Sequence, residues 1–224
     1  MATFNKKISK KVTTTDSFFG SMVRGIYPAV VENSNALAKQ VSLLEYPLGE
    51  YLHCNTPWAE VDHVLMPIRM GVHAHWILVH LDIRNRCLNV YNSCCATIRD
   101  GEVRVDVQPF ALVIPHLMAN IDIWQPVIVN GIQRIEPLVV NLVHDIPQQS
   151  NGTDCGVFVI KYAEYFMNDM MERMPNPFDA TSERIYLASQ LYKHGLHKIN
   201  EGYESDPDFL SRRERKARKG ANKK

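Results

Sequence analysis

The chain has 224 residues, 46% of them hydrophobic and 22% charged, which is enough to bury the core of one globular domain. Its 25 Lys and Arg residues balance its 24 Asp and Glu residues, which excludes an overall composition typical of polyanion binding. Because no apolar signal-peptide core opens the chain and no run of about 18 apolar residues follows, we expect a soluble, non-secreted protein with no membrane partner.

Residues 1–56 predict an N-terminal helical segment. The segment begins with a lysine-rich stretch. Asp16 follows three threonines and is suited to cap a helix that contains Phe18 and Val23. A catalytic core is expected to follow, over residues 57–200.

Four apolar runs rich in β-branched residues predict strands. The second and third are separated by Ile83–Arg86, which has the length of a four-residue hairpin loop and pairs Asp82 with Cys87. The runs are Val61–Ile68, Trp76–Asp82, Cys87–Asn92 and Leu138–Val143.

Three further segments predict helices. Val107–Asp122 has helical spacing, although Pro115 should kink or split it. Cys155–Met171 is apolar on nearly every face, which predicts a helix buried in the middle of the fold. Thr181–Lys198 has Ser182 as a candidate cap and predicts a surface helix. Helices, then strands, then two helices indicate an α+β fold.

Residues 201–224 form a basic tail that we expect to be disordered. Residues 212–224 contain eight Lys and Arg residues and one Glu, which leaves 17 basic and 23 acidic residues in the rest of the chain. Such a tail is typical of a solvated arm, a nuclear-import signal or a nucleic-acid contact. We expect nuclear targeting, and nucleic acid is not an expected partner of the body of the protein.

The segment from Pro147 to Gly156 carries the clearest sign of chemistry. Its Ser, Asn and Gly residues form a turn that brings Asp154 to an N-cap position and Cys155 into the first turn of the buried helix. Free N–H groups at a helix start stabilise a thiolate, which makes Cys155 a candidate nucleophile. A small buried core cysteine is the alternative. Five irregularly spaced cysteines without a C-x-x-C pair predict neither a disulfide framework nor a zinc site, and they favour a reducing compartment.

A thiolate nucleophile needs a base, and His75 stands at the start of a predicted strand, where its side chain can face a cleft. His80 is inside the strand and His73 is in a loop. These three histidines make a poor metal site, because no carboxylate or cysteine lies at helical ligand spacing, so we expect neither a metal nor another cofactor.

These residues together resemble a known family. His75-Trp76, a Tyr-x-Ser seventeen residues later, and Gln-Gln-x-Asn-Gly-x-Asp-Cys-Gly-Val-Phe are similar to the ubiquitin-like-protein proteases, the SUMO-specific cysteine peptidases of the adenain-like clan. The similarity extends over roughly residues 58–170. It implies a papain-like architecture, with a central mixed sheet and a helix that starts at the nucleophile, and a SUMO-type modifier as partner.

The resemblance also implies roles for single residues. Cys155 is similar to the nucleophile, His75 to the general base, and Gln149 to the side-chain donor of the oxyanion hole. An amide N–H aimed at the developing oxyanion contributes about 3 kcal/mol to transition-state stabilisation. Trp76 resembles the aromatic lid over the channel for a Gly-Gly tail, with an ordinary core aromatic as the alternative.

The chain departs from the family pattern at the third member of the triad. The family has Asp there, whereas this chain has Asn92. The predicted hairpin register puts Asn92 opposite Ile77 and diagonal to His75, so Asn92 can orient the imidazole. Asp82 cannot replace it, because about 23 Å of strand separate it from His75 and alternation sends it to the other face. Asn lacks the charge that favours an imidazolium, although other cysteine proteases use Cys-His-Asn.

The second departure is the missing tryptophan motif that forms the other wall of the Gly-Gly channel. Trp58 does not match it, so either the wall is built differently or the chain begins after it. The leading hypothesis is a thiol protease that cleaves after the Gly-Gly of a ubiquitin-like modifier. A catalytically weak modifier-binding module and a viral or mobile-element processing protease are the alternatives.

Overall fold

The computed structural model describes residues 10–52, 56–129 and 132–203 of the chain. The described chain forms two units, residues 1–180 and residues 181–224, and each is considered by itself. The predicted boundaries at residues 56/57 and 200/201 stay predictions. Phe19, Leu37 and Tyr46 of the N-terminal segment belong to the same core as the strands.

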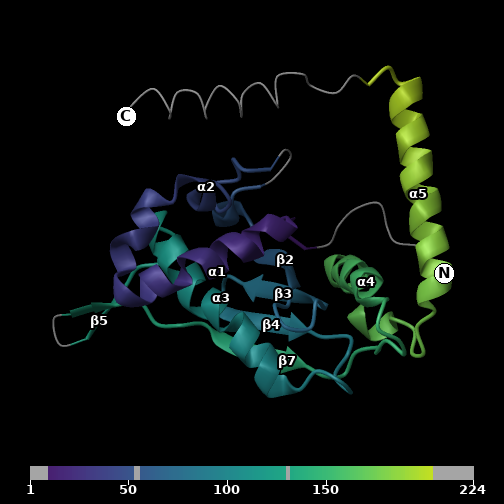
Figure 1. Cartoon of the computed structure of the whole chain (residues 1–224). Helices are drawn as coiled ribbons and strands as arrows, with labels where there is room; N and C mark the ends of the chain where they lie inside the picture. The colour runs from purple at the N-terminus through teal and green to yellow at the C-terminus, as the bar shows by residue number, and fades with distance from the viewer. Residues whose placement is uncertain (1–9, 53–55, 130–131, 204–224) are drawn as a thin grey trace. The chain divides into compact units, whose positions relative to one another are not determined.

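A five-stranded mixed sheet organises the first unit (Figure 1). Its strand order is β1-β2-β3-β4-β7, in which the β1–β2 and β4–β7 pairs are parallel and the β2–β3 and β3–β4 pairs are antiparallel. This confirms the predicted α+β fold with a mixed sheet. The strands are β1 Val12–Thr14, β2 His63–Arg69, β3 Trp76–Asp82, β4 Cys87–Tyr91 and β7 Val139–Val143.

The β3–β4 hairpin has the predicted register, in which Asp82 pairs with Cys87 and Leu78 with Tyr91. The four-residue loop is held by Asp82, whose carboxylate accepts hydrogen bonds from the backbone N–H and the side-chain amide of Asn85, both at 2.9 Å. Arg86 closes the loop with a φ of 51°. The other predicted strands differ from the observed ones by one or two residues at their ends.

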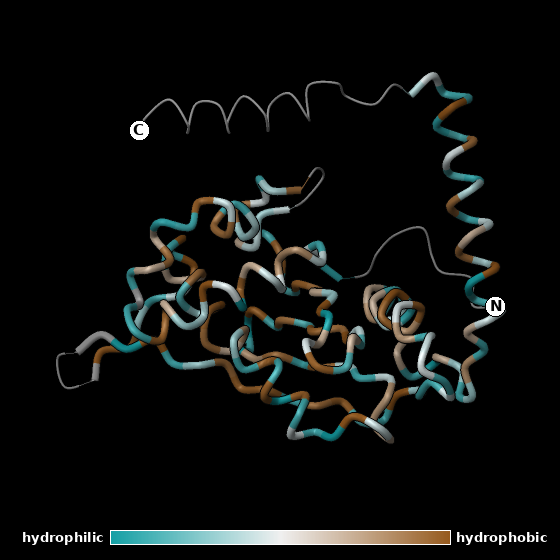
Figure 2. The backbone as a smooth tube through the Cα atoms, viewed as in Figure 1, coloured by the Kyte–Doolittle hydropathy of each residue, from teal (hydrophilic) through white to brown (hydrophobic). Residues whose placement is uncertain are grey.

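Helices cover the two faces of the sheet differently. Because side chains alternate along a strand, Val79 and Val90 belong to one face and His80 and Tyr91 to the other. The first face packs with α1 and α3 into one large core, whereas the second face contacts the aromatic side chains of α4. Figure 2 shows the apolar stretches along these strands and helices. The helices are α1 Ser17–Glu32, α3 Asp100–Asn120 and α4 Cys155–Met167.

The N-terminal segment is more varied than the single predicted helix. Asp16 caps α1 as expected, since its carboxylate accepts from the N–H groups of Phe18 and Phe19. Strand β1 precedes this helix, and short helical turns follow it. These are η1 Ser34–Lys39, α2 Val41–Leu44 and η2 Trp58–Glu60.

Three predicted helices have different bounds in the structure. Helix α3 begins seven residues before Val107 and continues through Pro109 and Pro115 without being split. Helix α4 ends at Met167, and a separate turn follows it. Helix α5 contains Ser182 within its first turn, so Ser182 does not cap it. The remaining elements are η3 Met171–Arg173, α5 Ala180–Asn200 and the hairpin of β5 Val127–Val129 with β6 Ile132–Arg134.

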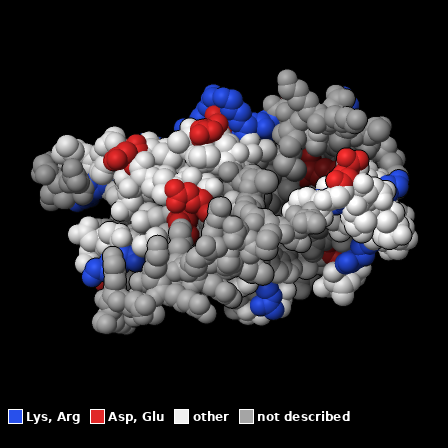
Figure 3. Space-filling view, turned by 90° about the horizontal axis from the view of Figure 1, so that it is seen from above, with Lys and Arg blue, Asp and Glu red and all other residues white. Residues whose placement is uncertain are grey.

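The surface of the described residues carries charges of both signs. On the face seen in Figure 3, acidic and basic side chains are interspersed. No helix among the described residues is both long and apolar enough to cross a bilayer. The predicted basic tail lies almost entirely outside the described residues.

Candidate active site

Cys155 is the first residue of helix α4, as the sequence predicts, and is 8% exposed. Asn151 shapes the turn before it, since its Oδ1 accepts from the N–H groups of Thr153 at 2.9 Å and Asp154 at 3.2 Å. Asp154 occupies the N-cap position, but its side chain makes no capping bond. The predicted N-cap position of Asp154 is therefore confirmed, and its carboxylate accepts from Asn151 Nδ2 at 2.7 Å instead of from the helix backbone.

His75 and Asn92 meet at the end of the β3–β4 hairpin. The Nε2 of His75 lies 2.9 Å from the Oδ1 of Asn92, and the two residues are 6% and 5% exposed. The hairpin register produces this contact, because it places Asn92 one step beyond Tyr91, diagonal to His75. The structure thus brings together two of the predicted site residues.

The hydrogen bonds of Asn92 decide which ring nitrogen of His75 carries the proton. The backbone N–H of Cys94 donates to Oδ1 of Asn92 at 2.9 Å, so this atom is the amide oxygen and can only accept. Nε2 of His75 is then the donor, and Nδ1 is the unprotonated nitrogen. The Nδ2 of Asn92 is buried without a hydrogen-bond partner among the described residues.

Aromatic contacts align helix α4 along the sheet. Phe166 lies 4.3 Å from the ring of His80, and Tyr162 lies 5.9 Å from the ring of Tyr91, which pairs with Leu78. The direction from Phe166 to Tyr162 along helix α4 is therefore the same as the direction from His80 towards His75 along the sheet. Eleven helical residues and five strand residues each span about 16 Å. By this estimate the start of α4 and the start of β3 lie at a similar position along the sheet.

The loop before Cys155 is joined to the loop after β4. Gln149 N–H donates to the carbonyl of Ser93 at 2.8 Å. Gln148 accepts from the N–H of Cys95 at 2.9 Å and donates through Nε2 to the carbonyl of Asn92 at 3.1 Å. The sequence analysis did not identify Gln148 or Ser93. For Gln148, its position directly before Gln149 was the one available signal. These bonds fix the nucleophile loop against the residue that orients His75.

Gln149 is partly buried, and both ends of its amide are bound. Its Oε1 accepts from the hydroxyl of Ser93 at 2.7 Å, and its Nε2 donates to the carbonyl of Asn151 at 2.5 Å. One amide N–H is thereby used and the second remains. The geometry suits the predicted donor, because a restrained amide needs little reorganisation when negative charge develops beside it.

The turn that carries His75 is tied to helix α3. His73 Nε2 lies 2.9 Å from Glu102 Oε1, and Ala74 has a φ of 51°. Burial lowers the pKa of His75, the bond to Asn92 raises it, and the nearby His73 lowers it again, with a net shift downward. His75 is therefore neutral at pH 7 and able to accept a proton.

Of the tryptophans considered, Trp76 lies next to the base, as the first residue of β3. It is partly buried and pairs with Arg69 across the β2–β3 ladder. Trp58 is fully buried and lies 5.8 Å from Phe19 in the core. It cannot form a channel wall from that position.

One group among the described residues offers metal-type ligands in proximity. His63, His80 and Asp82 have ligand atoms within 4.8 Å of one another. All three have protein partners, since the two histidines are 3.0 Å apart and Asp82 holds Asn85. His73, His75 and His80, the set weighed from the sequence, do not form such a group within the described chain.

Known proteins resemble this chain in sequence and in structure. Sentrin-specific protease 2 of Pongo abelii is 32% identical over 112 residues, which are 49% of this chain and 17% of that protein. The same protease of Mus musculus is 33% identical over 112 residues, with the same shares. The matched segment thus spans about a sixth of the length of these relatives. A solved structure of the SUMO protease Ulp1, with its catalytic cysteine oxidized to a sulfonic acid, has 18% identity and a TM-score of 0.49, over 83% of this chain and 71% of that chain.

The sequence profile of the Ulp1 protease family, C-terminal catalytic domain, matches residues 2–199. That range includes the sheet, the helix that begins at Cys155, and all the predicted site residues. The chain belongs to the Ulp1 protease family.

Proposed function

We propose that this chain is a thiol protease that cleaves after the terminal Gly-Gly of a SUMO-type modifier, in processing or in deconjugation. The observation that carries the proposal is the hydrogen bond from His75 Nε2–H to Asn92 Oδ1. It leaves Nδ1 of His75 unprotonated and able to act as the base that a cysteine nucleophile needs. Membership of the Ulp1 protease family supports the assignment.

In the first half of the reaction, Nδ1 of His75 takes the proton of the Cys155 thiol. The thiolate attacks the carbonyl carbon of the last modifier glycine, and the carbonyl oxygen becomes negatively charged. The side-chain N–H of Gln149 and the backbone N–H of Cys155 donate to this oxygen. His75 then passes its proton to the leaving amine, and the C–N bond breaks to leave a thioester on Cys155.

In the second half, His75 takes a proton from a water molecule that attacks the thioester carbonyl. The same two N–H groups stabilise the second oxyanion. The C–S bond breaks, the modifier leaves as a free carboxylate, and Cys155 regains the thiol state. Every proton is handled by His75, so the chemistry of this chain requires no cofactor.

Trp76 is proposed as the lid over the Gly-Gly tail. Its support is its position beside His75 at the start of β3, partly buried rather than enclosed in the core. Because glycine has no side chain, a narrow aromatic channel admits Gly-Gly and excludes larger residues.

Modifier probes with an electrophile in place of the C-terminal carboxylate test the proposal. SUMO vinyl sulfone should form a covalent adduct with the wild-type chain at Cys155, and ubiquitin vinyl sulfone should not. Cys155→Ala should abolish the adduct, whereas Cys94→Ala should retain it. Failure of the wild type to react with any modifier probe would refute the protease assignment.

A modifier-binding module is the second candidate, and the neutral Asn92 beside His75 is the observation that favours it. An uncharged partner stabilises an imidazolium less than a carboxylate does. The same probe experiment separates the two functions. Binding of unmodified SUMO without any adduct would identify a binding module.

For localisation we propose a nuclear or nucleocytoplasmic protein, on the support of the basic residues between 212 and 224. Deleting residues 211–224 from a fluorescent fusion should shift it towards the cytoplasm. An unchanged distribution would contradict the proposal.

A further inference from the structure

Ser93 is a buried hydroxyl outside the proposed triad, and it contacts the proposed oxyanion donor twice. It is 1% exposed. Its Oγ lies 2.7 Å from Oε1 of Gln149, and its carbonyl accepts the backbone N–H of the same glutamine at 2.8 Å. A side chain bound at both its backbone and its tip by one residue has little freedom left.

The two contacts of the Gln149 side chain also identify which of its terminal atoms is the amide oxygen and which is the nitrogen. An amide side chain can rotate by 180°, which exchanges its oxygen and nitrogen with little change in shape. The carbonyl of Asn151 can only accept, so the atom 2.5 Å from it is the nitrogen. The atom beside Ser93 is then the oxygen, and the Ser93 hydroxyl must be the donor.

We propose that Ser93 is a positioning residue that holds the Gln149 amide with an N–H, and not the oxygen, facing the reacting carbonyl. The proposal rests on the function proposed above. In the opposite orientation the amide oxygen would face the developing oxyanion and repel it. The Asn151 carbonyl, which can only accept, disfavours that orientation, and the Ser93 hydroxyl holds the amide in the observed one by donating to Oε1.

The placement of Ser93 links the two halves of the site. Asn92 and Ser93 are consecutive residues of the bend that follows β4, and their side chains bind different partners. Asn92 thus orients the base while Ser93 orients the oxyanion donor. One short segment after β4 therefore sets the relative geometry of both groups.

Ser93→Ala tests this role in the full chain, with a SUMO precursor as substrate. The variant should lower kcat by about tenfold and leave KM unchanged, because only transition-state stabilisation is lost. The rate of Cys155 alkylation by iodoacetamide should not change, since the thiolate precedes any oxyanion. Ser93→Thr keeps the hydroxyl and should restore at least half of the lost kcat. Ser150→Ala, an exposed serine of the same loop, is the matched control and should match the wild type.

A double-mutant cycle distinguishes positioning from general damage. If Ser93 acts through Gln149, then adding Ser93→Ala to Gln149→Ala should cost no further activity. A further tenfold loss in the double variant would overturn the proposal. So would equal alkylation and cleavage losses in Ser93→Ala, which would indicate a distorted site.

A readout without catalysis separates this inference from the proposed function. Side-chain amide protons of Gln149, assigned by their loss in Gln149→Ala, should exchange more slowly than those of the exposed Gln125. In Ser93→Ala they should exchange faster than in the wild type, although the bond to the Asn151 carbonyl remains. Unchanged exchange would refute the positioning role even where the wild type cleaves SUMO, and absence of cleavage with the expected exchange would refute only the proposed function.

Discussion

His75 directly precedes β3 and His80 lies within it, five residues further on, but the two side chains have different hydrogen-bond environments. Burial lowers the pKa of both. His80 is 3% exposed and uses both ring nitrogens, with His63 Nδ1 at 3.0 Å from Nε2 and Asn89 Nδ2 at 3.3 Å from Nδ1. His75 uses Nε2 alone, on Asn92, and its Nδ1 has no hydrogen-bond partner within the described part of the chain.

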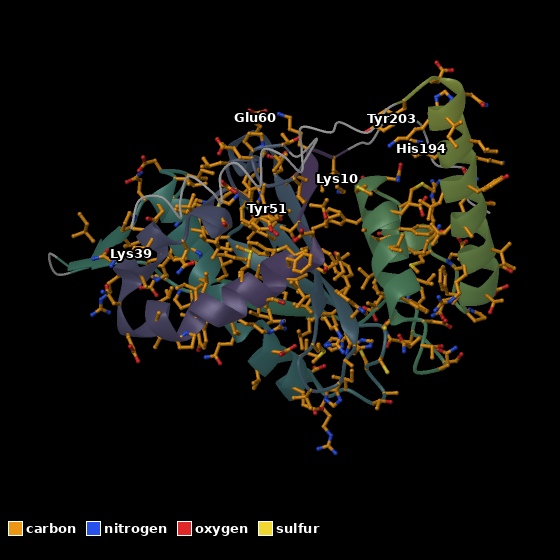
Figure 4. The ribbon with its side chains drawn as sticks, turned by 45° about the horizontal axis from the view of Figure 1, so that its top comes forward. Lys10, Lys39, Tyr51, Glu60, His194 and Tyr203 are labelled. Atoms are coloured by element: carbon orange, nitrogen blue, oxygen red, sulfur yellow. The ribbon has the colours of Figure 1, made fainter. Side chains whose placement is uncertain are left out.

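The His80 end forms a closed chain of polar contacts across four strands. Asn141 Nδ2 donates to Asn89 Oδ1 at 3.2 Å, which extends the chain from β2 to β7. Phe166 covers the two histidines, and Lys10, labelled in Figure 4, lies over Phe166 and pairs with Asp169 at 2.8 Å. A closed network stabilises the fold, whereas a base must keep a lone pair available. The two ends of the hairpin differ in that respect.

Replacing each histidine in turn gives the largest expected difference. His75→Ala should lower kcat by about 10³, because general-base catalysis is lost. His80→Gln should leave cleavage at pH 7.5 within about twofold and lower the free energy of unfolding by 1 to 2 kcal/mol, roughly the cost of one disturbed buried contact. Steady-state cleavage of a SUMO precursor and urea unfolding measure the two effects. Equal losses of activity would show that the ends are not functionally distinct.

Acid should destabilise the His80 end. Burial, with His63 adjacent, lowers the pKa of His80 to about 4, below the ordinary value of 6.5. Between these values the unfolded chain binds more protons, so the free energy of unfolding falls as pH falls from 6.5 to 4, by about 3 kcal/mol for this group. The pKa values of His63 and His75 are also lowered, and they act in the same direction.

Urea unfolding at a series of pH values measures this loss, with His80→Gln as the control. The variant should have a flatter dependence of unfolding free energy on pH between 6.5 and 4. Identical slopes in the wild type and the variant would show that His80 already carries a proton in the folded chain.

Gln149 and Gln148 are adjacent, and the first has a proposed catalytic role whereas the second holds two loops together. Gln149→Ala should lower kcat by about 10² with little change in KM, because its N–H acts on the transition state. Gln148→Ala should mainly lower the free energy of unfolding, by about 1 kcal/mol, because it leaves the N–H of Cys95 and the carbonyl of Asn92 without their partner. Full activity in Gln149→Ala would assign the oxyanion donor to another residue.

Local patterns predicted the part of the fold that places His75. A four-residue loop and alternating apolar strands determined the hairpin register, and the contact between His75 and Asn92 follows from it. Strand β1 was not predictable, because three residues pair with β2 across about fifty residues of chain. Pro109 and Pro115 argued against a long α3, yet burial of Phe110 and Ile114 beside them outweighs the lost backbone bonds.

The same limit applies to the candidate site. Cys155 and His75 were predicted from residue type and position, at a helix start and a strand start, whereas Gln149 was predicted from the resemblance to the family motif. Ser93 and Gln148 could not be predicted, because their importance lies in hydrogen bonds between loops that only the folded chain brings together. Sequence patterns identify reacting groups more readily than the groups that orient them.

Variants of Asn92 should give the smallest changes in cleavage activity. They test most directly the end of the β3–β4 hairpin that lies beside His75. Asn92→Asp removes the buried Nδ2, which lacks a partner among the described residues, and places a carboxylate against His75 Nε2–H. The charge raises the pKa of His75 by about one unit or more and stabilises a thiolate–imidazolium pair. Cleavage at the optimum pH should therefore rise about threefold, and the acidic limb of the pH profile should move to higher pH, because His75 must lose its proton to act as the base.

Asn92→Ala should act in the opposite direction. It removes the oxygen that accepts from His75 and from the N–H of Cys94, so the imidazole loses its fixed tautomer and cleavage should fall about tenfold. The same precursor assay, run from pH 5 to pH 9 on all three proteins, compares them directly. Equal rates with Asn, Asp and Ala at position 92 would mean that this residue does not orient His75. The proposed triad would then lack its third member.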